Sequence, residues 1–277
     1  MKKMKYVKDN GQKELLLVSA GITSDDIAHT DNISIENSLS NIADNYKKVD
    51  GTLSQCLFIV VSGGTERERC FFQELDEKES FRSLKVVFLS STPNAGGLTP
   101  KMMQELWANC LKNGSVERNG QKFQIESIDK VYMVTDVDHY EDELRDILKS
   151  SKDNNPQWII SNPDIEIWIY YCFRNTPIDD LQSVIDAPQS KKSSLMKTIN
   201  GTFNNGGGLD PRKAFAEIVT GITNASSFYQ EDELHFPNLL STQMCFLAKE
   251  IYDVLGQEFI DWNEERIRKI NSYKTRF

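Results

Sequence analysis

The chain has 277 residues, 39% of them hydrophobic and 26% charged, which is an ordinary composition for a globular protein. Its formal net charge of −9 excludes a broadly basic surface for nucleic acid and leaves room only for a local basic patch. Apolar runs such as residues 57–61 are too short to cross a bilayer, and the five scattered cysteines and three distant histidines lack zinc-ligand spacing. We therefore expect a cytoplasmic protein without a membrane-spanning segment.

Residues 1–52 are expected to form an N-terminal extension, in which residues 14–19 have the composition of a strand. Residues 36–46 carry apolar side chains at helical spacing, which predicts an amphipathic helix.

Strands and helices alternate over residues 53–175. Apolar runs at 56–61, 84–89, 131–134 and 157–160 predict buried strands, and each precedes a segment with helical spacing, at 66–75, 98–111, 140–149 and 164–173. This alternation predicts an α/β domain with a central parallel sheet built of right-handed crossovers. Beyond residue 175 the alternation stops, and segments 191–197, 210–219, 241–255 and 261–273 predict a helical C-terminal region, 176–277, packed on the sheet.

Asp136 and Asp138 follow the predicted strand 131–134, which is apolar on both faces. Open α/β sheets have their ligand crevices at this carboxyl edge. Two neighbouring carboxylates repel each other unless a cation lies between them, and oxygen ligands suit Mg²⁺ or Mn²⁺. We therefore predict that both aspartates are catalytic and hold a metal. The alternative is that they only cap the helix that follows.

A second motif, Ser62-Gly63-Gly64-Thr65, connects the strand 56–61 to a helix that begins near Glu66. Glycines let the backbone approach a ligand, and amides at a helix start attract phosphate, so these four residues are predicted to bind phosphate. Glu66 is expected near the same sheet edge as the aspartates, as a metal ligand and catalytic residue. The alternative is an ordinary tight turn followed by a glutamate that stabilises the helix start.

The third motif is Ser-Asn-Pro-Asp-Ile-Glu-Ile-Trp at residues 161–168, after the strand 157–160. Pro163 delays the helix, and Glu166 falls in its first turns, either facing the crevice or anchoring the helix start. Because parallel strands end at one edge, Glu66, the aspartates and Glu166 are expected to converge. A carboxylate cluster holding one or two divalent ions is suited to phosphodiester chemistry.

Lys191, Lys192 and Lys197 form the densest basic cluster after the first eight residues. Together with Arg212 and Lys213, they are candidates for contacts with nucleic-acid phosphates. The alternative is a solvated helix face.

Together the three motifs resemble the RloB-like family of bacterial restriction-modification and phage abortive-infection operons, which is related to the Toprim domains of topoisomerases, primases and OLD-family nucleases. The family pattern is a strand ending in Glu-Gly-x-Thr-Glu, a later strand ending in Asp-x-Asp, and then Ser-Asn-Pro-x-Phe-Glu-x-Trp. Residues 62–66, 136–138 and 161–168 match this pattern in order, spacing and strand context. The resemblance implies a Toprim-like fold and a suspected nuclease that acts beside an ATPase partner in phage defence.

Ser62 departs from the family pattern, because it occupies the position of the first glutamate, to which the resemblance assigns a general-base or metal-binding role. A serine hydroxyl brings no charge to a metal and cannot take up a proton at neutral pH without an activating base. The first hypothesis is therefore a Mg²⁺- or Mn²⁺-dependent nuclease acting on tRNA or DNA. The second is a catalytically inactive subunit that binds nucleic acid or a partner, and the third is a nucleotide-handling phosphotransferase.

Overall fold

Parallel strands form a central sheet in the order β2-β1-β5-β6. The computed structural model describes residues 56–78, 80–91, 96–150 and 156–274. The sheet consists of β1 (Cys56–Ser62), β2 (Leu84–Leu89), β5 (Lys130–Asp136) and β6 (Gln157–Ser161). In β1, the residues from Phe58 to Val61 are completely buried, as expected for a strand covered on both faces. The predicted α/β fold with a parallel sheet is confirmed.

The chain divides into two units, Met1–Val49 and Asp50–Phe277, and all described residues belong to the second. The strand and the helix predicted at 14–19 and 36–46 lie outside the described residues.

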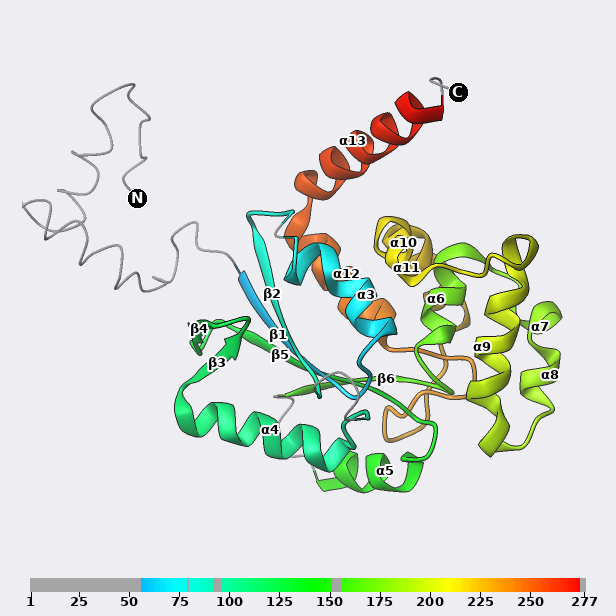
Figure 1. Cartoon of the computed structure of the whole chain (residues 1–277). Coiled ribbons are helices and arrows are strands. Elements are labelled where there is room, and N and C mark those ends of the chain that lie inside the picture. Colours follow the sequence, from blue (N-terminus) through cyan, green and yellow to red (C-terminus); the bar gives the residue numbers. More distant parts are fainter. Residues whose placement is uncertain (1–55, 79, 92–95, 151–155, 275–277) are drawn as a thin grey trace, which may run out of the picture. The chain divides into compact units, whose positions relative to one another are not determined.

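Helices cover both faces of the sheet (Figure 1). On one face, α4 (Pro100–Asn113) and α5 (Glu141–Ser150) pack through a cluster that includes Met103, Trp107 and Leu144. On the other face, α3 (Arg67–Asp76), α6 (Glu166–Phe173) and α12 (Met244–Leu255) share a larger cluster with the sheet. The alternation of side chains along each strand therefore divides the buried apolar residues of the strands between two cores.

A β-hairpin between α4 and β5 was not predicted. It consists of β3 (Ser115–Arg118) and β4 (Gln121–Gln124), paired antiparallel. Its turn residues Asn119 and Gly120 have φ angles of 53° and 78°. An Asn-Gly pair favours this left-handed turn, so the sequence did contain the signal.

The C-terminal third is helical, as expected. It contains α7 (Pro177–Asp180), α8 (Gln182–Ile185), α9 (Gln189–Gly206), α10 (Pro211–Ala214), η2 (Phe215–Glu217), α11 (Ile218–Phe228) and α13 (Gln257–Lys274), besides α12. The regular path of α9 is broken at Phe203, Asn204 and Asn205, which have non-helical backbone angles. Within the described ranges, no helix is both long and apolar enough to cross a membrane.

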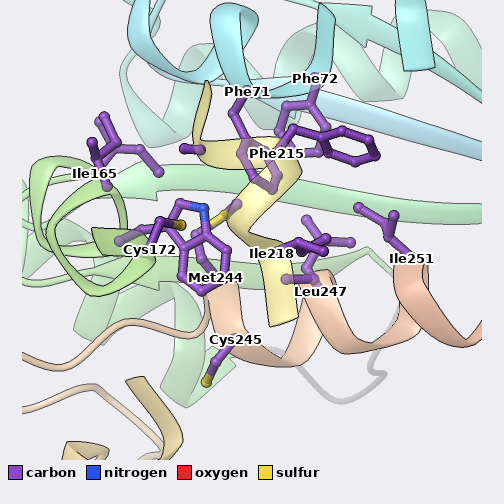
Figure 2. Close-up of a cluster of buried hydrophobic side chains, with 14 of the residues drawn as sticks. Phe71, Phe72, Ile165, Cys172, Phe215, Ile218, Met244, Cys245, Leu247 and Ile251 are labelled. Atoms are coloured by element: carbon purple, nitrogen blue, oxygen red, sulfur yellow. The ribbon is translucent and has the colours of Figure 1, made fainter. Parts of the chain in front are cut away.

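The C-terminal helices share one core with the sheet. Figure 2 shows Phe71 and Phe72 of α3 beside Phe215, with Ile218 and Leu247 below them. The ring centroids of Phe71 and Phe215 lie 5.8 Å apart in an edge-on arrangement. The helical region is therefore part of the same hydrophobic core, and it holds α9 and α10 beside the carboxyl edge of the sheet.

Candidate functional site

The carboxyl edge of the sheet gathers acidic side chains from three strand ends. Asp136 is the last residue of β5, Glu68 lies in the first turn of α3 after β1, and Asp164 and Glu166 follow β6. Since β5 pairs with both β1 and β6, the segments that follow these three strands are neighbours. We call Glu68, Asp136, Asp164 and Glu166 the acidic cluster.

The acidic cluster is buried to an extent that is rare for carboxylates. Glu68 is 3% exposed, Asp164 1% and Glu166 0%, whereas Asp136 is partly buried. Removing carboxylates from water is costly unless a cation or hydrogen bonds compensate. The contacts of these groups therefore indicate what the site is built to hold.

Burial and mutual repulsion raise the pKa values of three members of the acidic cluster. The pKa of Asp136 is raised well above its ordinary value by burial and by the charges of Glu68 and Asp164. The pKa of Asp164 is likewise raised well above its ordinary value, by burial and by the charge of Glu166. The pKa of Glu68 is raised, mainly by burial. In each case the charge of Lys197 acts in the opposite direction, so this lysine is a shared counter-charge of the site.

Glu166 is held from two sides. Nε of Arg67 lies 3.0 Å from its Oε1, and Nδ2 of Asn200 donates to its Oε2 at 2.8 Å and to its backbone oxygen at 2.9 Å. Glu166 therefore acts as a buried anchor that positions Arg67 and Asn200.

Asp164 is only partly satisfied. Its Oδ1 accepts the backbone N–H of Glu166, the first residue of α6, at 3.1 Å, whereas Nζ of Lys197 lies 3.9 Å from Oδ2. Among the described residues, no group donates a hydrogen bond to this buried Oδ2. The helix-cap geometry explains why the sequence pattern did not single out Asp164, because an Asp before a helix is ordinarily a cap.

The structure brings Glu68, and not the predicted Glu66, into the acidic cluster. Glu66 is exposed at the N-cap of α3, whereas the charge of Glu68 raises the pKa of Asp136. The missed signal is helical spacing, because Glu68 precedes Phe71, Phe72 and Leu75 on the buried face of α3.

Asp138 lies at the rim of the site. It adopts a φ of 24°, its backbone N–H donates to the Pro163 oxygen at 3.1 Å, and its Oδ1 is 3.6 Å from Nε2 of His139. Its charge contributes to the raised pKa of Asp164. The predicted Asp-x-Asp pair is therefore split, since Asp136 points into the cluster and Asp138 stays half-exposed.

The turn at residues 62–65 is tightly bonded. Ser62 is completely buried and its Oγ donates to the Gly64 oxygen at 3.0 Å, while the backbone N–H of Gly63 donates to the Val134 oxygen at 2.8 Å. A Cβ atom at Gly64 would overlap the carboxylate of Glu68, so this glycine makes room for the acidic cluster. Phosphate binding by Ser62, Gly63, Gly64 and Thr65 stays a prediction.

Replacing Ser62 by Glu is expected to strengthen the binding of Mg²⁺ or Mn²⁺ and to destabilise the metal-free protein. Ser62 follows Phe58 and Val60 on the face of β1 that packs in the larger core, the same side as Tyr132 and Val134 before Asp136. A new carboxylate there adds to the repulsion without metal and to the attraction with it.

Calorimetric titration with metal and thermal melts in chelator measure both effects of Ser62→Glu. Ser62→Gln is the matched control, because it introduces the same bulk without the charge. Equal metal affinities for the two variants would contradict the placement of residue 62 beside the acidic cluster.

The three candidate lysines have different environments. Lys191 is exposed, and Lys197 lies beside Asp164 as described above. Lys192 is only 8% exposed, and its Nζ donates to the backbone oxygens of Val184 and Ile185 at 2.9 and 3.0 Å. Lys192 therefore stabilises the end of α8. The predicted contact of its ammonium with a nucleic-acid phosphate is wrong for this arrangement, because the ammonium is bonded inside the protein.

The donor chemistry of the acidic cluster fits a divalent cation. Glu68, Asp136 and Asp164 offer only oxygen, their mutual charges raise their pKa values, and Asp164 Oδ2 is buried without a donor. Within the described residues, no group of three or more His, Cys, Asp or Glu side chains is placed so that it could hold a metal ion. Cation binding by Glu68, Asp136 and Asp164 therefore rests on the chemistry of these side chains alone.

A family model described as "RloB-like protein" matches residues 58–251, which run from β1 to α12 and include the whole acidic cluster. The chain belongs to the RloB-like family. No curated protein and no solved structure is significantly similar to this RloB-like chain. The family resemblance seen in the sequence motifs is thus confirmed over a region larger than the motifs themselves.

Proposed function

We propose that this RloB-like protein is a metal-dependent phosphodiesterase of the nuclease type, with a Toprim-like catalytic domain, that acts in phage defence. The observation that carries the proposal is the convergence of three carboxylates from three strand ends, with raised pKa values and one unbonded buried oxygen. Three carboxylates buried together are costly unless protonation or a bound cation neutralises them, and we propose the cation. The phage-defence role and an ATPase partner come from the motif resemblance.

The roles of the side chains follow from their contacts. A bound Mg²⁺ or Mn²⁺ supplies an activated water and stabilises the leaving oxygen. Glu68, Asp136 and Asp164 would hold the cation, and Lys197 offsets the excess negative charge of these carboxylates. Glu166 fixes Arg67 through Nε, which leaves the terminal guanidinium nitrogens to orient a phosphate. Asp138, 31% exposed at the rim of the site, adds to the negative charge near Asp164.

A second candidate, an inactive binding subunit, is favoured by one observation. Ser62 stands where the family has a glutamate, and its hydroxyl is already donated to the Gly64 oxygen. Residue 62 therefore supplies no general base, and another carboxylate or solvent would have to take the proton from the attacking water.

Cleavage assays test the proposal. The substrates are tRNA, single-stranded RNA, single-stranded DNA and duplex DNA, each with Mg²⁺, Mn²⁺ or chelator. We expect metal-dependent cleavage of at least one substrate and its loss by about 10²-fold or more in Asp136→Asn, since a carboxylate that holds the cation is removed. Asp146→Asn is the matched control, because this aspartate is 79% exposed on α5.

Metal titration by calorimetry separates the two candidates. Metal binding that Asp136→Asn weakens, without cleavage of any of the four substrates, would identify the inactive subunit. Unaltered metal binding in Asp136→Asn would contradict the proposed site.

A further inference from the structure

A polar cavity of about 520 Å³ lies beside the acidic cluster, between the start of α3 and the segment that connects α9 to α10. Arg67 and Cys70 line it from α3, and Asn200, the glycines at 206–208 and Arg212 line it from the other side. Its volume is in the range of small-molecule sites and exceeds what a phosphate alone would need.

The walls of this cavity suit an anion with polar groups. The side chains of Arg67 and Arg212 are 41% and 69% exposed, and the charges of both lower the pKa of the Cys70 thiol, against the effect of its burial. Gly206 and Gly208 have φ angles of 84° and 71°, a backbone path that glycine adopts readily, and they carry no side chains to fill the cavity. Only Leu209 and Pro211 among the lining residues present sizeable apolar side chains.

The cavity and the acidic cluster share Glu166 as a bonding partner of their side chains. Arg67 lines the cavity and pairs with Glu166 at 3.0 Å, and Asn200 lines it and donates to the same carboxylate at 2.8 Å. Since Glu166 is completely buried, this anchor fixes the distance between the cavity wall and the carboxylates. A strand bound in the cavity would therefore present its neighbouring phosphodiester to the acidic cluster.

We propose that this cavity binds one nucleotide of the nucleic-acid strand, with its phosphate between Arg67 and Arg212. The proposal rests on the proposed function, since it assigns the position of the substrate next to the cleaved bond. Asp210 lowers the affinity of the cavity for phosphate. Its carboxylate pairs with Arg212 through two contacts of 2.9 and 3.0 Å and so neutralises part of the positive charge.

Two substitutions that should change the oligonucleotide affinity in opposite directions test the proposal. In chelator, Arg212→Ala should weaken binding of a 5′-phosphorylated oligonucleotide about tenfold and reduce the slope of log affinity against log salt by about 0.7, the loss of one phosphate contact. Asp210→Asn should strengthen binding several-fold, because it removes a negative charge while Asn still caps α10. Lys213→Ala is the control: it removes an equal charge at the next residue, which does not line the cavity.

Thiol alkylation locates the bound strand. The oligonucleotide should slow alkylation of Cys70, and it should leave alkylation of Cys110 unchanged, because this similarly half-buried thiol lies in α4 on the opposite face of the sheet. AMP and inorganic phosphate serve as smaller probes, and they should protect Cys70 only at higher concentration than the oligonucleotide.

Three results would overturn the proposal: equal oligonucleotide affinities for Arg212→Ala and Lys213→Ala, equal protection of the two thiols, or an AMP affinity as high as that of the oligonucleotide. Because binding is measured in chelator, failure of cleavage leaves these readouts intact. Conversely, metal-dependent cleavage that is unaffected by Arg212→Ala, together with unchanged binding, would refute the cavity alone.

Discussion

Glu68→Gln is expected to reduce metal-dependent cleavage by about 10²-fold or more, whereas Glu66→Gln should retain nearly all of it. The two glutamates are two residues apart, but Glu68 is 3% exposed within the acidic cluster and Glu66 is exposed at the N-cap of α3. Steady-state cleavage rates of the two variants, measured side by side with metal titrations, make the comparison. Equal losses in the two variants would contradict the assignment of Glu68.

The same variant should stabilise the protein without metal. The pKa of Glu68 is raised in the folded state, so the folded protein binds more protons than the unfolded chain between the ordinary pKa of 4.5 and the raised value. The stability of the metal-free wild type therefore falls as the pH rises through this window, and Gln removes that loss. We expect a higher melting temperature for Glu68→Gln in chelator at high pH, and a difference that shrinks as the pH falls toward the ordinary pKa of 4.5. A constant difference across this range would show that ionisation of Glu68 is not its cause.

Gly221→Ala is expected to lower the free energy of unfolding by about 1–3 kcal/mol, the usual cost of overpacking a core. Gly221 lies in α11, and a Cβ atom there would be 2.8 Å from both the Cys172 sulfur and a ring carbon of Trp168. Neither side chain can move aside easily, since Trp168 is 0% and Cys172 1% exposed.

Gly201→Ala is the matched control for this prediction. It is also a helical glycine, in α9, but no heavy atom lies within 4 Å of the position of its Cβ. Because alanine favours helix, Gly201→Ala should be neutral or stabilising by up to about 1 kcal/mol. Denaturant unfolding of both variants measures the difference. A Gly221→Ala variant as stable as Gly201→Ala would contradict the close packing of α11 on α6.

The sheet could be predicted because its signals are local. The segments 56–61, 84–89, 131–134 and 157–160 are almost entirely apolar, with Lys85 and Gln157 as the polar members, and they became β1, β2, β5 and β6 with boundaries shifted by two residues at most. A strand covered on both faces is apolar at nearly every position, and the sequence shows such runs directly. The edge at which the acids gather followed from the same alternation, since parallel strands all end on one side.

The membership of the acidic cluster was only partly predictable. Asp136 and Glu166 were expected and are present, but Glu66 was named in place of Glu68, and Asp164 was not named. Two residues along an α-helix correspond to a rotation of about 200°, so an error of two positions exchanges the solvent side for the core side. Only the packing of Phe71, Phe72 and Leu75 on the sheet shows which glutamate faces inward.

The cavity beside Arg67 could not be predicted from the sequence, because only the tertiary structure brings its walls together. Its walls come from residues 67–70 and 200–212, which are more than a hundred positions apart, and composition gave no reason to connect them. The sequence did identify Arg212 and Lys213 as possible phosphate contacts, but it treated them alike; the fold directs only Arg212 to the cavity. Local patterns thus determined the strands and the sheet edge at which the acids gather. Long-range packing of the core decides the rotation of each helix and the positions of α9 and α10. These in turn determine which side chains meet at the sheet edge.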